Sequence, residues 1–141
     1  RMQEFLDILK EFAISNPNKE ITKDFVYSNF LLWLNGLIED DPIPFEVKSL
    51  VFYVTKNLEI GFSGSERENV KLVDLYFYYP LDSEYFDFKP LYNYFSKNNF
   101  NKNEVLNYLK NLLKKLKSDK YFSKFNYYFG FLYNIAKKLE S

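Results

Sequence analysis

The segment Lys48-Ser-Leu-Val-Phe-Tyr-Val-Thr-Lys-Asn-Leu-Glu-Ile-Gly-Phe-Ser63 decides the fold of this chain. Its first half is apolar or β-branched at both odd and even positions, which is typical of a strand covered on both faces. Lys56 and Asn57 then form a two-residue turn, because Asn tolerates a positive φ. The second half alternates again, with one apolar face made by Leu58, Ile60 and Phe62. The segment therefore predicts a β-hairpin.

Two helices are predicted before this hairpin. Apolar residues recur at helical spacing over residues 2–14, and Ser15-Asn-Pro-Asn18 ends that helix. Thr22 is an N-cap residue type, so a second helix follows it and ends near Asn35-Gly36, where a left-handed residue is expected. Two prolines then make residues 39–44 a loop.

A third strand is predicted over residues 70–79, with Pro80 at its end. One of its faces carries Lys71, Val73, Leu75, Phe77 and Tyr79. The polar loop over residues 64–69 connects this strand to the hairpin. Residues 80–100 are less regular, and they contain one short predicted helix over residues 90–95.

The tail of the chain returns to helical spacing. Asn101 or Asn103 caps a helix whose apolar residues are Val105, Leu109, Leu112, Leu113 and Leu116. Ser118-Asp119 ends that helix and caps a last one, with Phe125, Tyr128, Phe129, Leu132, Ile135, Ala136 and Leu139. Because the connection is short, the two helices are expected to be antiparallel neighbours.

These elements predict a single α+β domain over residues 1–141. A three-stranded antiparallel sheet, spanning about residues 47–79, is covered by two N-terminal and two C-terminal helices. The switch of the apolar period from 3.6 to 2 and back supports this order. The side chains expected in the core are Phe52, Ile60, Phe77, Leu109, Phe129 and Leu132.

The composition excludes several kinds of chemistry. The chain has no cysteine and no histidine, so disulfides, thiolate metal sites and the commonest general base are absent. No apolar run is long enough for a membrane span, and the first residues lack the pattern of a signal peptide. We therefore expect a cytoplasmic protein without a membrane partner. The abundance of Lys, Asn, Tyr and Phe indicates an AT-rich, bacterial genome.

Three acidic groups are candidates for chemistry: Glu39/Asp40/Asp41, Glu66/Glu68 and Asp82/Glu84/Asp87. Paired carboxylates can hydrolyse sugars or bind Mg²⁺ or Ca²⁺, but none of these groups has the spacing of a known metal loop. The segment Gly61–Ser65 lacks the Gly-Lys-Ser/Thr of a phosphate loop, and its serines have no histidine to activate them. We predict no catalytic residue, no cofactor and no metal.

The charges are unevenly distributed although the net charge is zero. Residues 39–87 contain 4 basic and 11 acidic side chains, and residues 100–141 contain 9 basic and 3 acidic ones. The acidic middle and the basic tail can neutralise each other, or one of them can be a docking surface. The lysines of residues 110–120 lie among aromatics, but arginine is scarce, so nucleic acid is not the expected partner.

Tyrosines and carboxylates are mixed in and around the segment Asp74-Leu-Tyr-Phe-Tyr-Tyr-Pro-Leu-Asp-Ser-Glu-Tyr-Phe-Asp-Phe88. Rigid amphipathic rings with charges around them are typical of protein interfaces. Core packing and codon bias are the alternative explanation. The predicted partner-binding residues, here named the acidic rim, are Glu66, Glu68, Tyr76, Tyr78, Asp82, Glu84, Tyr85 and Asp87. The expected partner is a protein with a basic surface.

In size, composition and charge layout, the whole chain resembles the small cytosolic immunity proteins that bacteria keep beside secreted or contact-delivered toxins. The resemblance implies a compact protein without catalytic residues that presents an acidic face to a basic toxin. It rests on no residue motif, so it assigns no role to any residue. Two alternatives remain open: an accessory protein of a phage or mobile element that binds a host factor, and a structural or adaptor domain. The sequence leaves the oligomeric state open.

Overall fold

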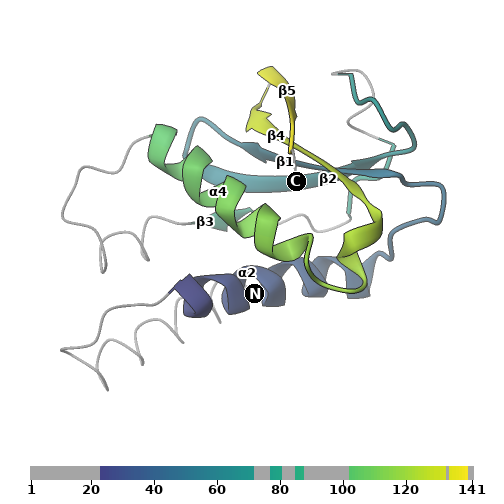
Figure 1. Cartoon of the computed structure of the whole chain (residues 1–141), viewed down its shortest axis with the longest axis horizontal. Helices are drawn as coiled ribbons and strands as arrows, with labels where there is room; N and C mark the ends of the chain where they lie inside the picture. Colours follow the sequence, from purple (N-terminus) through teal and green to yellow (C-terminus); the bar gives the residue numbers. More distant parts are fainter. Residues whose placement is uncertain (1–22, 72–76, 81–84, 88–101, 133, 140–141) are drawn as a thin grey trace.

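The computed structural model describes residues 23–71, 77–80, 85–87, 102–132 and 134–139 (Figure 1). Within these residues, the strands form one five-stranded sheet in the order β3-β2-β1-β4-β5. The strands are β1 (Ser49–Val54), β2 (Glu59–Ser65), β3 (Phe86–Asp87), β4 (Asn126–Phe131) and β5 (Asn134–Lys138). Strand β1 is parallel to β4, and the other neighbouring pairs are antiparallel. Helices α2 (Lys23–Asp40) and α4 (Lys102–Leu116) share one core with one face of the sheet.

Helix α2 confirms the second predicted helix but continues beyond the predicted end. None of the described glycines has a positive φ, and the helix passes through Gly36 to Asp40. Pro42 follows, and a proline disfavours helical backbone at the residue before it. The apolar stripe of α2 is buried, and it comprises Val26, Phe30, Trp33, Leu34 and Leu37. The helix predicted over residues 2–14 lies outside the described residues.

Strands β1 and β2 form the predicted hairpin, with Phe52 opposite Phe62. Its turn differs from the prediction. The N–H of Leu58 donates to the carbonyl oxygen of Thr55 at 2.9 Å, and Leu58 rather than Asn57 has the positive φ, at 62°. The left-handed conformation is uncommon for a bulky residue, and Leu58 keeps its side chain packed against the core.

The strand predicted over residues 70–79 has one described pairing. Tyr78 pairs antiparallel with Gly64, and further along the same edge of β2 Phe86 pairs with Ile60. The chain advances eight positions from Tyr78 to Phe86, whereas their partners in β2, Gly64 and Ile60, are only four positions apart. The segment that pairs with the outer edge of β2 is therefore not one regular strand. Residues 72–76 and the short helix predicted over residues 90–95 lie outside the described residues.

Helix α4 is confirmed, but the last predicted helix is wrong. Asp119 Oδ1 accepts the N–H of Tyr121 at 2.9 Å in a turn, and only a short 3-10 helix, Phe122–Lys124, follows before β4 and β5. Strand β4 lies next to β1 and is buried on both faces, so its apolar residues do not alternate and their spacing also suits a helix. The predicted three-stranded antiparallel sheet is therefore a mixed sheet with two more strands.

The two faces of the sheet have different neighbours. The helix-covered face contains Phe52, Ile60, Leu109 and Phe129 in one core, as predicted. The other face, here called the loop-covered face, has a small cluster of Val51, Tyr53 and Tyr128, with Val70 and a half-buried Leu132 at its side. Phe77 is 45% exposed, so its predicted burial was wrong. Of the helices in the described segments, none combines the length and apolarity that crossing a membrane requires.

Candidate functional site

The structure separates the predicted acidic rim instead of gathering it. Glu66 and Glu68 are exposed just after β2, and Tyr85 is partly exposed just before β3. The pairing of Phe86 with Ile60 places Tyr85 at the opposite end of β2 from Glu66. Six residues of strand span about 20 Å, so these side chains belong to different surface regions. Three further rim residues, Tyr76, Asp82 and Glu84, lie outside the described residues, as does the side chain of Asp87.

Tyr78 was wrongly expected on the surface. It is 4% exposed, and its ring packs edge-on against Phe62 at 5.8 Å. Its hydroxyl donates to the carbonyl oxygen of Asp41 at 2.5 Å. Burial and then the nearby Asp41 raise the pKa of Tyr78 far above its usual value. Tyr78 therefore joins the outer segment to the end of α2 and is not available to a partner.

Three tyrosines instead form a surface cluster, here named the tyrosine edge: Tyr53, Tyr79 and Tyr85. Tyr85 packs edge-on against Tyr53, with 6.4 Å between the ring centroids, and its side chain hydrogen-bonds with both other tyrosines. Tyr79 and Tyr85 are each more than a third exposed, whereas Tyr53 is buried beneath them. The sequence predicted that Tyr85 belongs to a binding surface. It did not indicate Tyr53 and Tyr79, which come close to Tyr85 only in the folded chain.

Gly61 makes room for the tyrosine edge. A Cβ atom at this position would overlap the ring of Tyr53, which therefore lies directly over the backbone of β2. Burial, then the neighbouring Tyr79, raises the pKa of Tyr85, and Glu59 adds to the same shift. A tyrosine hydroxyl with its ordinary pKa of 10.0 is already protonated at neutral pH, and the raised pKa of Tyr85 extends the protonated range to more alkaline pH. The tyrosine edge thus presents fixed aromatic rings and neutral hydroxyls beside one carboxylate.

A second exposed aromatic region lies at the opposite end of β1, and the sequence reasoning missed it. Phe45 is 93% exposed on the proline-flanked loop between α2 and β1. It borders a hollow of about 400 Å³ that Tyr121 and Lys124 also line. Lys124 Nζ lies 4.6 Å from the centroid of the Tyr121 ring. We name this region the Phe45 surface. In the sequence, the available sign of an exposed loop here was the pair of prolines, Pro42 and Pro44, just before Phe45.

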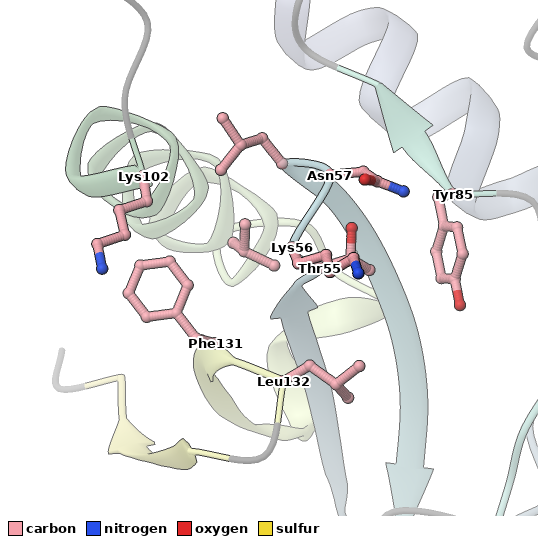
Figure 2. Close-up of a pocket in the computed structure, with 9 residues that line it drawn as sticks. Thr55, Lys56, Asn57, Tyr85, Lys102, Phe131 and Leu132 are labelled. Atoms are coloured by element: carbon pink, nitrogen blue, oxygen red, sulfur yellow. The ribbon is translucent and has the colours of Figure 1, made fainter.

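A third region is the pocket at the end of the hairpin, with a volume of about 680 Å³. Figure 2 shows Lys102 and Phe131 on one side of it and Tyr85 on the other, with the β1–β2 turn above Leu132. Tyr85 therefore belongs both to this hairpin-end pocket and to the tyrosine edge. The sequence did not predict this pocket, because its walls come from four separate segments.

The acidic groups do not converge in the described part of the chain. Among those residues, no three His, Cys, Asp or Glu side chains are close enough to hold a metal ion. Asp40 ends α2, and Glu66 and Glu68 lie in the loop after β2. Ser63 and Ser65, on the loop-covered face, are buried.

Neither a family model, nor a curated protein, nor a solved structure matches this chain.

Proposed function

We propose that this chain is a non-catalytic protein-binding domain that docks a partner with a basic surface on the tyrosine edge, with the acidic excess of residues 39–87 attracting that partner. The observation that carries the proposal is the tyrosine edge itself. Tyr79 and Tyr85 expose part of their rings while hydrogen bonds hold Tyr85 in place. Preordered tyrosines are favoured interface anchors, because they add contact area while losing little side-chain entropy on binding.

Charge supplies the second part of the argument. Residues 39–87 carry seven more acidic than basic side chains, and Glu59 lies beside Tyr85. A field of one sign accelerates association with an oppositely charged partner, and added salt weakens that acceleration. The aromatic anchors then slow dissociation, since hot spots concentrate in buried Tyr, Trp and Arg side chains. Asp82, Glu84 and Asp87 remain predicted contributors.

The narrower form of the proposal is an immunity protein that binds and neutralises a cognate bacterial toxin in the cytoplasm. A protein of this kind needs no catalytic residue, because it inhibits by covering the active site of the toxin. The lack of histidine and cysteine in this chain is compatible with that mechanism.

The test uses the product of the adjacent gene, co-expressed with this chain and then titrated with it. An immunity protein restores growth of the host and inhibits the toxin at equimolar concentration. The double variant Y79A/Y85A should weaken binding about 30-fold or more, as expected for a loss of about 2 kcal/mol at an interface anchor. The variant E59K should lower the association rate and its salt dependence.

Tyr121→Ala is the matched control, because Tyr121 is also a partly exposed tyrosine but belongs to the Phe45 surface. It should leave affinity within about threefold of the unmodified chain. If Y121A weakens binding while a folded Y79A/Y85A does not, the interface is the Phe45 surface. If neither changes binding, the lysine face of residues 110–120 is the next candidate. The immunity function itself fails if the complex forms without inhibiting the toxin.

A further inference from the structure

The hairpin-end pocket joins an apolar wall to two cationic side chains. Leu58, Phe131 and Leu132 supply much of the apolar surface, and Lys56 and Lys102 lie at its margin. Its volume of about 680 Å³ is comparable to that of small-molecule sites, which are about 300–1,000 Å³. The pocket is thus large enough for a molecule the size of a bicyclic aromatic acid.

The two lysines come from different elements, and both line the pocket. Lys56 lies in the β1–β2 turn and Lys102 is the first residue of α4, with Nζ 5.9 Å from the centroid of the Phe131 ring. A cation–π contact of this kind keeps an ammonium group near an apolar wall. Within the described part of the chain, neither ammonium group forms an ion pair.

The charge of the pocket is positive on balance. No carboxylate is among its described lining residues, although Glu59 follows Leu58 and Glu84 precedes Tyr85 in the sequence. Asn57 and Tyr85 add uncharged polar groups at the margin (Figure 2). A cation would meet two ammonium groups here, whereas an anion would gain two favourable interactions beside an apolar wall.

We propose that the hairpin-end pocket binds a small amphipathic anion, such as an aromatic carboxylate or sulfonate. Its apolar body packs against Phe131 and Leu132, and its anionic group lies between Lys56 and Lys102. This inference goes beyond protein binding and does not depend on it, because the side chains that hold the anion lie outside the tyrosine edge. Tyr85 borders both regions, so an occupant of the pocket also lies next to the tyrosine edge.

The test is a fluorescence titration of the full chain with 8-anilinonaphthalene-1-sulfonate, an aromatic anion whose emission rises in apolar surroundings. Naphthalene-2-carboxylate should displace the probe, and naphthalene-2-methanol, which has the same rings without the charge, should displace it at least about tenfold less well. The double variant K56Q/K102Q should weaken binding of the probe by about tenfold or more. Backbone amide shifts should change at Leu58 and Leu132.

The control is K110Q/K114Q, which removes the same charge from exposed positions on α4 outside the pocket. It should change the affinity by no more than about twofold, because screened charges at a distance contribute little. Any one of three results would overturn the proposal. They are equal weakening of binding by both double variants, displacement of the probe by the alcohol as good as that by the carboxylate, and amide shifts centred on Phe45. If the first double variant fails to fold, K56Q and K102Q are compared singly with K110Q by the same criteria.

Discussion

The two faces of the sheet are held by different interactions. On the helix-covered face, aromatic rings pack closely, as where Phe52 stacks on Phe62 with 5.1 Å between the ring centroids. On the loop-covered face, polar contacts join the strands to the loop above them, as where Tyr128 donates to the carbonyl oxygen of Glu68 at 2.8 Å. Burial of a large apolar side chain stabilises a fold more than one net hydrogen bond does. The helix-covered face should therefore supply most of the folding free energy.

The difference also separates stability from binding. The tyrosine edge lies beside the loop-covered face, with Tyr53 in the small cluster and Tyr79 and Tyr85 partly exposed next to it. Substitutions on that face should change surface recognition at a modest cost in stability. Four measurements test this difference between the two faces.

Phe52→Ala should produce the largest loss. Phe52 is fully buried in the centre of the helix-covered face, between Phe62, Tyr127 and Phe30. Removing its ring should lower the free energy of unfolding by about 3–5 kcal/mol, because a cavity remains among rings that cannot collapse fully. Urea unfolding measures this loss. A decrease below about 1.5 kcal/mol would show that the two faces contribute similarly.

Gly61→Ala should be the most damaging small change on the loop-covered face. The new methyl group would overlap the Tyr53 ring, which must move and take the tyrosine edge with it. We expect a loss of about 1–3 kcal/mol, the range for an overpacked site. In a Tyr53→Ala background the same change should cost less than about 0.5 kcal/mol, because the ring is gone. If Gly61→Ala lowers stability equally in the Tyr53→Ala background, the strain lies in the backbone of β2.

Alkaline pH should destabilise the helix-covered face through Tyr127. Burial raises the pKa of this hydroxyl above its ordinary value of 10.0, and the hydroxyl donates to the carbonyl oxygen of Phe122 at 2.6 Å. Above the unfolded pKa, the unfolded chain loses this proton first, so stability falls as pH rises. Each such tyrosine lowers the unfolding free energy by at most about 1.4 kcal/mol per pH unit. Tyr127→Phe should reduce that slope; an identical slope would assign it to other tyrosines.

Two serines of the loop-covered face should give the smallest effects and opposite signs. Ser49 Oγ donates to the carbonyl oxygen of Arg67 at 2.6 Å, whereas the buried Ser63 Oγ has no hydrogen-bond partner among the described residues. Ser49→Ala should therefore lower stability by about 1 kcal/mol, and Ser63→Ala should leave it unchanged or raise it by up to about 1 kcal/mol. Thermal unfolding of both variants checks the pair. A loss at Ser63 as large as that at Ser49 would indicate an unrecognised partner.

Local patterns were sufficient for some elements and not for others. The β1–β2 hairpin was predictable because its strands are adjacent in sequence and a turn separates them. Strand β4 was not, because its partner β1 lies more than seventy positions earlier in the chain. Both faces of β4 are also buried, so its apolar residues do not alternate with polar ones. Its aromatic residues then satisfied a helical spacing as well.

The choice of face explains why the burial of Phe77 and of Tyr78 was predicted wrongly. A strand that shifts by one position exchanges its two faces, so Phe77 and Tyr78 exchange exposure and burial. In the structure, Tyr78 enters the core and Phe77 remains exposed. The sequence placed Tyr85 in the acidic rim, and Tyr85 is partly exposed, but the sequence offered no sign that Tyr53, from another strand, lies against it.

By itself the sequence determined the positions of α2, α4 and the β1–β2 hairpin, and it excluded histidine and cysteine chemistry. Those features depend on residue identity and on spacing within a few turns or strand positions. The sequence did not indicate that β4 pairs with β1, that Tyr78 is buried, or that the tyrosine edge and the hairpin-end pocket exist; these features appear only in the folded chain. Each of these features arises from contacts between segments that are distant in the chain. Local periodicity does not specify the register or the burial of such segments.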